Sequence, residues 1–460
     1  MNQNNLILSR WQRLRYIPTT EQDRKDMLKS IGLQSMEGLF DDVPDRVRLQ
    51  GELNLPSAQT EYELFKSLKS LAEKNNNLEQ YPSFLGAGAY GHLIPSAVQH
   101  ILSRSEFYTA YTPYQPEISQ GVLQAIYEYQ SLICSLTGMD VANASLYDGA
   151  TALAEAAVLA GEATKRKKIF LPMTIHPEYR MVTQLYLENR GMEVIQIPHD
   201  KGQTDLNYLK DNINEEIAGV LIQQPNFFGI LEEVKEVASL TQKFGALLVV
   251  SVNPISLGIL EAPGHYGADI AVGEGQGLGN PVAFGGPFLG FFATRDRFIR
   301  QIPGRIVGAT KDIEGKRGFV LTLQTREQHI RRQRASSNIC SNQALNALAA
   351  TVFLCLVGKK GLQEVANLCL QKAHYAYRKI TSIKGYSPLF TQPFFHEFPI
   401  QTPDSPEVIN KVLLEKGIIG GLDLKRHYPE LGPSMLLCVT EARTKKEIDT
   451  LVQALENYHE

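Results

Sequence analysis

The first 80 residues carry apolar positions at helical spacing and few signals for strands. Thr60 followed by Glu63 predicts a capping box, and the leucines at 64–71 recur at intervals of three and four on one face of a helix. The same reasoning predicts a shorter helix over 20–32, which opens with a second capping box. We therefore expect residues 1–110 to form an N-terminal helical arm and an extended segment.

From about Pro116 the pattern changes to helices that alternate with short apolar strands. An amphipathic helix is predicted over 117–137 and ends at Gly138. The segment 246–252 (ALLVVSV) is apolar throughout, as expected of a central parallel strand buried on both faces. Further strands are predicted at 140–144, 168–171, 193–197, 218–223 and 269–272, with helices at 149–163, 177–190, 205–213 and 232–243. This alternation predicts parallel βαβ units in a large, doubly wound α/β domain over residues 111–335.

Two apolar helices and a smaller layer of strands and helices follow. The two helices are predicted over 341–358 and 361–382. The apolar stretch 344–357 is shorter than the roughly 20 residues that a membrane span needs, so we expect it to be buried in protein. The remaining segments alternate between strand and helix, namely FFHEFPI, PEVINKVLLEKG, SMLLCVT and TKKEIDTLVQAL. They predict a small C-terminal α/β domain over residues 336–460.

Charge and composition narrow the classes of function. The 46 Lys and Arg residues balance 49 Asp and Glu residues, which gives a net charge of −3. Nucleic-acid-binding and membrane-surface proteins usually show a basic excess, so we expect neither kind of partner. The amino terminus lacks the apolar core of a signal peptide. The five cysteines form no CxxC pair, which argues against a disulfide framework and a zinc site, and a cytoplasmic location suits them.

Three other patterns are weaker candidates for chemistry. The GAGAYG run at 86–91 is a literal GxGxxG, but no strand precedes it and no helix follows directly, so an irregular loop is predicted rather than a dinucleotide site. Asp148 stands where the next helix begins, and its charge favours a helix cap over a phosphate site. His92, His176 and His199 lie too far apart in sequence for a local metal motif, and we expect no metal.

The most informative run is YTPYQPEISQG, residues 111–121, which directly precedes a long helix. It combines tyrosines, prolines, amides, a glutamate and hydroxyl groups within eleven residues. Such polar density is costly to bury unless each group finds a hydrogen-bond partner. The run therefore indicates the wall of a site or a contact between subunits.

Together with YIPTTEQDRKDML (16–28) and SLYDGATALAEAA (145–157), this run resembles the glycine decarboxylase P-protein family of the glycine cleavage system. The resemblance is closer to the amino-terminal-half type, subunit 1, found where the enzyme is split into two chains. Further matching motifs are PSFLGAGAYGHLIP (82–95), QPNFFGILE (224–232), GQGLGNPVAFGGPFLGFFA (275–293) and SNICSNQALNALAA (337–350). The resemblance extends over about residues 16–450.

The resemblance implies a pyridoxal-phosphate-dependent transferase type I fold, like that of aspartate aminotransferase. Such an enzyme needs a lysine for the Schiff base and an acidic partner for the pyridine nitrogen. In type I folds the lysine follows the late strands, yet no lysine lies between Lys243 and Lys311. The central strand ends with Ser251 and Asn253 in place of an acid, and Asp148 disfavours the phosphate. We therefore predict that this chain keeps the fold without binding the cofactor.

The split-enzyme family also implies the partners. Subunit 2 is expected to carry the pyridoxal phosphate in an α2β2 assembly, with glycine and the lipoylated H-protein as the substrate and the acceptor of the aminomethyl group. No catalytic residue of this chain's own is expected. By the resemblance, the residues that complete the active site are Tyr111, Thr112, Tyr114 and Gln115, positioned by Glu117, Ser119 and Gln120.

Two alternatives stay open at this point. The chain could be an independent pyridoxal-phosphate enzyme, such as an aminotransferase or desulfurase, that uses a displaced lysine, for which Lys311 is the first choice. It could also be a catalytically silent scaffold. The scaffold differs from the preferred hypothesis only in the role of the loop at 111–121.

Overall fold

The computed structural model describes residues 18–49, 51, 53–339 and 342–458, and its contacts divide the chain into two units after Asn75. The first 17 residues of the predicted arm and positions 340 and 341 lie outside this described part. In the first unit, α2 (Glu21–Ser30) and α3 (Glu61–Ala72) each begin with the predicted capping box, so both helices are confirmed. Neither helix has a buried residue.

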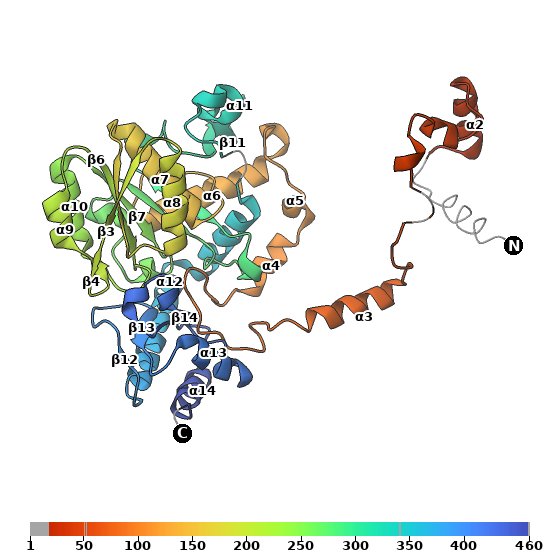
Figure 1. Ribbon diagram of the computed structural model, residues 1–460. Helices are drawn as coiled ribbons and strands as arrows, with labels where there is room; N and C mark the ends of the chain where they lie inside the picture. The colour runs from red at the N-terminus through yellow and green to blue at the C-terminus, as the bar shows by residue number, and fades with distance from the viewer. Residues whose placement is uncertain (1–17, 50, 52, 340–341, 459–460) are drawn as a thin grey trace. The chain divides into compact units, whose positions relative to one another are not determined.

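The second unit (Figure 1) is built on a seven-stranded sheet, whose strand order is β1-β9-β8-β7-β6-β2-β3. The neighbours β3, β2, β6, β7 and β8 pair in parallel, which confirms the predicted βαβ units. The strands are β1 (Val141–Ala142), β2 (Lys168–Pro172), β3 (Glu193–Ile197), β6 (Ile217–Gln224), β7 (Leu247–Val252), β8 (Ile270–Glu274) and β9 (Gly290–Thr294). The edge strand β1 pairs antiparallel with β9, and β9 pairs antiparallel with β8. We did not predict β9, because its apolar residues follow a Gly- and Pro-rich stretch.

Helices cover both faces of this sheet, and β7 shows how the two faces are divided. Leu248 and Val250 pack in a core with α6 (Gln120–Thr137) and α12 (Ala344–Ile380), whereas Leu247 and Val249 pack in a second core with α7 (Gly149–Thr164). This alternation follows from the two-residue period of a strand. The other helices along this part of the chain are α4 (Ser96–Leu102), α5 (Ser105–Tyr108), α8 (Pro177–Glu188), α9 (Leu206–Asn212), α10 (Val234–Phe244) and α11 (Gln328–Arg331).

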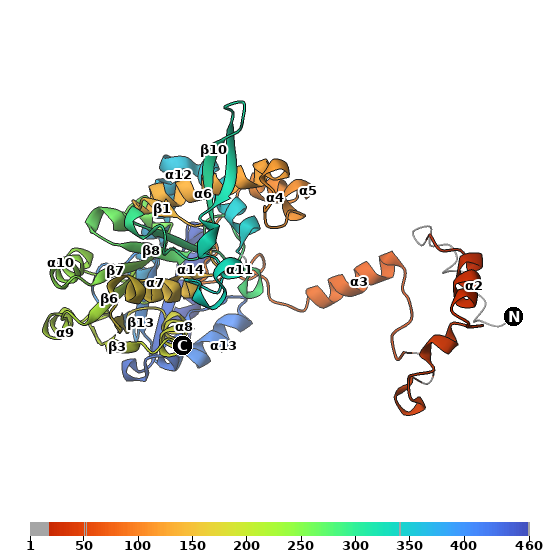
Figure 2. The ribbon, with the colours of Figure 1, turned by 90° about the horizontal axis from the view of Figure 1, so that it is seen from above.

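Two separate two-stranded hairpins and a long helix accompany the large sheet. The strands β4 (His199–Asp200) and β5 (Gln203–Thr204) form one hairpin, and β10 (Ile306–Lys311) with β11 (Arg317–Thr322) forms the other, which projects from the body beside α6 (Figure 2). The helix α12 (Ala344–Ile380) is interrupted at Gly358, where φ is +58°. The break corresponds to the boundary predicted between two helices.

Among the described residues, α12 is long and apolar enough by length and composition to cross a membrane, and 44% of its most apolar window is buried inside the protein. Its buried apolar residues, such as Phe353, pack in the core beneath the large sheet.

A second, smaller sheet has the order β12-β13-β15-β14, and all its pairs are antiparallel. Its strands are β12 (Ser387–Pro388), β13 (Glu397–Gln401), β14 (Leu422–Asp423) and β15 (Ser434–Cys438), and its helices are α13 (Pro406–Glu415) and α14 (Lys445–Glu456). A separate apolar core lies around this sheet and includes Phe398 and Leu436. The strand and helix segments predicted for the C-terminal region are confirmed. The boundaries of the three predicted domains stay a prediction.

Candidate functional site

A small cavity lies where the parallel strands of the large sheet end. The ends of β6, β7 and β8 contribute Gln223, Asn253 and Glu274, and α8 contributes Tyr179. Open α/β sheets bind their ligands at this edge. Here the cavity encloses only about 30 Å³, room for about two water molecules. No lysine stands among the described residues that line it, and Lys311 lies at the exposed end of β10.

Glu274 occupies the position in this cavity that faces the first turn of α7. Its carboxylate accepts hydrogen bonds from the backbone N–H groups of Gly149 at 3.0 Å, and of Gln276 and Leu289 at 2.9 Å each. Burial raises the pKa of Glu274 to about 7 despite these bonds. Asp148 caps the same helix by accepting a bond from Thr151 N–H at 2.8 Å, which confirms the predicted cap. Two carboxyl groups of the chain, those of Asp148 and Glu274, thus already accept hydrogen bonds from N–H groups in the first turn of α7.

The GAGAYG run is an irregular loop, as predicted, and it closes the cavity from the other side. Ala87 N–H donates to Glu397 Oε1 at 2.6 Å, and Tyr90 Oη donates to Glu397 Oε2 at 2.8 Å. Ala87 O also lies 2.9 Å from Nε2 of His176, at the start of α8. Glu397 belongs to β13 of the small sheet, and burial raises its pKa to about 7. The loop therefore ties the two sheets together over the cavity.

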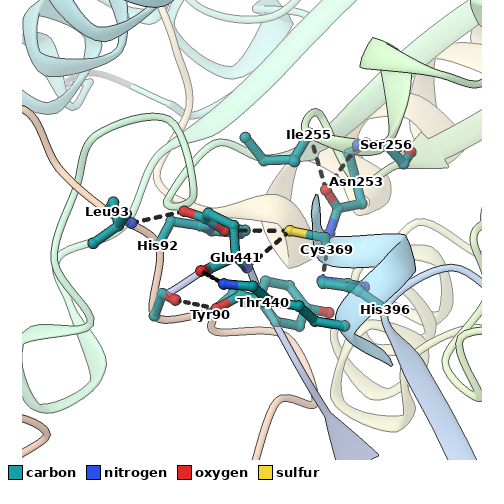
Figure 3. Close-up of polar contacts among 12 residues, drawn as sticks. Tyr90, His92, Leu93, Asn253, Ile255, Ser256, Cys369, His396, Thr440 and Glu441 are labelled. Atoms are coloured by element: carbon teal, nitrogen blue, oxygen red, sulfur yellow. Dashed lines mark hydrogen bonds and ion pairs between the residues drawn. The ribbon is translucent and has the colours of Figure 1, made fainter. Parts of the chain in front are cut away.

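A second buried polar group joins this loop to α12 and to the segment after β15 (Figure 3). Glu441 accepts a hydrogen bond from Leu93 N–H at 2.8 Å and one from the Cys369 thiol at 3.2 Å, and its Oε2 lies 2.7 Å from His92 Nδ1. Burial alone would raise the pKa of Glu441, but these bonds, led by that to His92, lower it to about 2.

The sequence analysis did not identify His92, Cys369 and Glu441 as neighbours. Along the chain, 277 positions separate His92 from Cys369, and 72 separate Cys369 from Glu441. His92, Cys369 and Glu441 could each offer one ligand atom to a metal, and these atoms lie within 4.8 Å of one another. However, the carboxylate and the thiol already bond within the group, and burial raises the pKa of Cys369, which keeps its thiol protonated. We therefore assign the group a structural role.

The run at 111–121 forms one wall of a larger cavity, of about 210 Å³, beside α6 and the start of α12. Tyr111 and Thr112 line this cavity, and Tyr111 is 82% exposed. The hydroxyl of Tyr114 accepts a hydrogen bond from Arg305 Nη2 at 3.0 Å, and the guanidinium lies 5.5 Å from the ring centre. The structure thus gathers three of the predicted residues around a buried arginine that sequence reasoning did not single out.

The remaining predicted residues lie farther along the run. Gln120 Nε2 donates to Phe319 O at 2.9 Å and its Oε1 accepts from Phe319 N–H at 2.8 Å, so this side chain holds β11 against α6. Gln115 and Glu117 are exposed, and Ser119 precedes α6 without a side-chain cap bond. Of these four residues, Gln120 is the one whose described side-chain hydrogen bonds could position the loop. The roles of the seven residues stay predictions.

Comparisons with known proteins agree with this architecture. The sequence profile described as "Glycine cleavage system P-protein" matches residues 14–455. A relative from Desulfitobacterium hafniense, named "Probable glycine dehydrogenase (decarboxylating) subunit 1", is 56% identical and covers 96% of this chain and 99% of its own. A relative of the same name from Moorella thermoacetica is also 56% identical, over 96% of this chain and 98% of its own.

Solved structures identify the fold. The inhibitor-bound crystal structure of glycine decarboxylase (P-protein) of the glycine cleavage system is 42% identical, with a TM-score of 0.88 over 96% of this chain and all of that chain. A sphingosine-1-phosphate lyase from Burkholderia pseudomallei, 15% identical with a TM-score of 0.65 over 90% of this chain and 94% of its own, shares the fold alone. The predicted pyridoxal-phosphate-dependent transferase type I fold is confirmed. The chain belongs to the P-protein family of the glycine cleavage system, within its group of subunits 1 of glycine dehydrogenase (decarboxylating).

Proposed function

We propose that this chain is the subunit of the decarboxylase that holds no pyridoxal phosphate, and that subunit 2 carries the cofactor in an α2β2 assembly. The observation that carries the proposal is the small size of the cavity at the strand ends. Ligand pockets usually enclose about 300–1,000 Å³, whereas this one encloses about 30 Å³. The residues present do not fit the cofactor, because Asn253 stands at the end of β7 in place of an acid and no described lining residue is a lysine.

Glu274 supports the same proposal because its carboxyl group already occupies the start of α7. The N-terminus of a helix offers N–H groups that can hold a phosphate, but Gly149 N–H is already bonded to the Glu274 carboxylate. A cofactor phosphate would have to displace this carboxylate or lie next to it and to Asp148. Both arrangements are unfavourable, because the first leaves the buried Glu274 carboxyl group without its hydrogen bond and the second places the phosphate against the Asp148 carboxylate.

We further propose that the loop at 111–121 completes the active site of subunit 2, where glycine loses CO2 and its aminomethyl group passes to the lipoyl arm of H-protein. The exposed ring of Tyr111 and the cavity behind it support this proposal, since the loop has a free face.

We also propose a cytoplasmic location. The four cysteines that the structure describes are unpaired, which supports a reducing compartment of this kind.

The first experiment incubates the purified chain with pyridoxal phosphate and records its absorbance. We expect no Schiff-base band and, after borohydride reduction, no pyridoxyl-lysine by mass spectrometry. Mixing the chain with subunit 2 should then produce glycine–bicarbonate exchange that neither chain shows alone. A stable aldimine on this chain, or a mixture without exchange activity, would contradict the proposal.

A second experiment separates an active-site wall from a silent scaffold. Tyr114→Phe and Gln115→Ala should leave the assembly with subunit 2 intact, as judged by its mass in solution, and lower the turnover of the assembled enzyme. Turnover equal to that of the unmodified complex would favour the scaffold.

A further inference from the structure

Arg305 is a buried cation whose hydrogen-bonding capacity is only partly used. Its side chain is 5% exposed, and of its donors only Nη2 has a partner, the Tyr114 hydroxyl at 3.0 Å. Nε and Nη1 have no hydrogen-bond partner among the described residues. Buried donors without partners are rare in folded proteins, because each costs about 1–3 kcal/mol. The free donors therefore point to a group that joins this site from outside the described residues.

Glu327 does not supply that group. Its Oε2 lies 3.6 Å from Arg305 Nε, which is close enough for an ion pair but too long for a hydrogen bond. Its other oxygen, Oε1, is also buried without a partner. The pair thus holds the guanidinium in place and balances its charge, and the planar edge of the guanidinium remains available.

The backbone fixes where Arg305 stands. Its carbonyl accepts a hydrogen bond from Ala144 N–H at 2.8 Å, and Gly304 before it has a φ of +73°, which turns the chain into β10. The side chain lines the cavity of about 210 Å³, whose other walls include Thr112, Val122, Ile126 and Leu348. These walls are mainly apolar, so the charge of Arg305 is poorly screened inside the cavity, and Glu327 balances it from the Nε side.

We propose that Arg305 binds the carboxylate of the amino-acid substrate in this cavity. A guanidinium presents parallel N–H groups that match the two oxygens of a carboxylate. Nε faces Glu327, so the fork left for an anion is the outer edge, formed by the free Nη1 and by the hydrogen of Nη2 that Tyr114 does not use. The inference rests on the proposed function, because glycine reaches the cavity only if the loop at 111–121 faces the active site of subunit 2. Tyr114 is then a positioning residue, which holds Nη2 while the remaining donors bind the ligand.

The test uses the complex reconstituted with subunit 2 and the variants Arg305→Gln and Arg305→Lys. Arg305→Gln should raise the KM for glycine in the exchange reaction by about tenfold or more with a smaller change in kcat, because a charged hydrogen bond to the substrate is lost. Arg305→Lys, which keeps the charge but not the planar fork, should have an intermediate KM and remains informative if the glutamine variant fails to assemble. Arg317→Gln, an exposed arginine on β11, is the matched control and should leave KM unchanged.

Two analogues of glycine identify the group that is recognised. Acetate has the carboxylate without the amine, and its competitive inhibition should weaken in Arg305→Gln. Methylamine has the amine without the carboxylate, and any inhibition by it should stay the same. An unchanged KM with unchanged acetate inhibition would overturn the inference while the unmodified complex still supports the proposed function. A weakened affinity for pyridoxal phosphate at an unchanged glycine KM would also overturn it, since Arg305 would then bind a phosphate.

Discussion

Glu155 lies in the middle of α7, and we predict that replacing it by glutamine stabilises the protein at neutral and alkaline pH. The residue is 4% exposed, and its Oε1 accepts a hydrogen bond from Ser337 Oγ at 2.9 Å. Burial raises the pKa of Glu155 from 4.5 to about 7, and the bond to Ser337 offsets this only in part. Glutamine has the same shape and keeps an oxygen that can accept the Ser337 proton.

The sign and size of the effect follow from proton linkage. Because the folded pKa lies above the unfolded one, the folded protein binds the proton more tightly, and stability is lost as pH rises from about 4.5 through 7. At 1.36 kcal/mol per pKa unit, the full loss is up to about 3 kcal/mol. Glu155→Gln removes it, so the two proteins should be equally stable near pH 4 and differ by up to this amount near pH 8.

Thermal unfolding followed by intrinsic fluorescence across this pH range is a suitable assay, and a gap of a few degrees in Tm should open as pH rises. Glu128→Gln, on the exposed face of α6, is the control and should give a gap that does not vary with pH. The reasoning is wrong if Glu155→Gln is destabilised equally at all pH values. That result would mean that the carboxylate is well solvated or paired.

Two further substitutions test other contacts. At Gly229, with φ of +78°, a Cβ atom would stand 2.0 Å from the backbone oxygen of Glu397, so Gly229→Ala should cost at least about 2 kcal/mol and lower the yield of folded protein. Gly432→Ala, at a φ of +65° with no atom within 4 Å, should cost far less, and equal losses would contradict this reasoning. Gln120→Ala removes both bonds to Phe319 and should increase hydrogen exchange at that amide and through the β10–β11 hairpin. Unchanged protection would show that the hairpin does not depend on this side chain.

Local patterns predicted the secondary structure well because the physics that produces it is local. The β7 strand is apolar on both faces in the sequence and buried on both faces in the protein. The cap at Asp148 and the break at Gly358 likewise follow from single residues. The strand β9 was missed because its Gly- and Pro-rich surroundings mask a short apolar segment.

The candidate site was harder to predict because its groups meet only in three dimensions. Glu274 bonds to Gly149 across 125 positions, and Tyr114 meets Arg305 across 191. One signal was present in the sequence: Arg305 stands beside Ile306 and Val307, and a charge next to a buried strand needs a partner. Sequence alone does not say which residue that partner is.

The two carboxylates that hold the GAGAYG loop have a consequence for motion. Glu397 and Glu441 come from the C-terminal region, and together they bind four groups of the segment 87–93. Gln276, beside the large sheet, binds Tyr90 of the same segment at both its N–H and its carbonyl. A hinge movement of the small sheet against the large one would break these buried bonds at once. We therefore expect the two sheets of the second unit to move as a single rigid body, and under the proposed function any closure over glycine would fall to subunit 2.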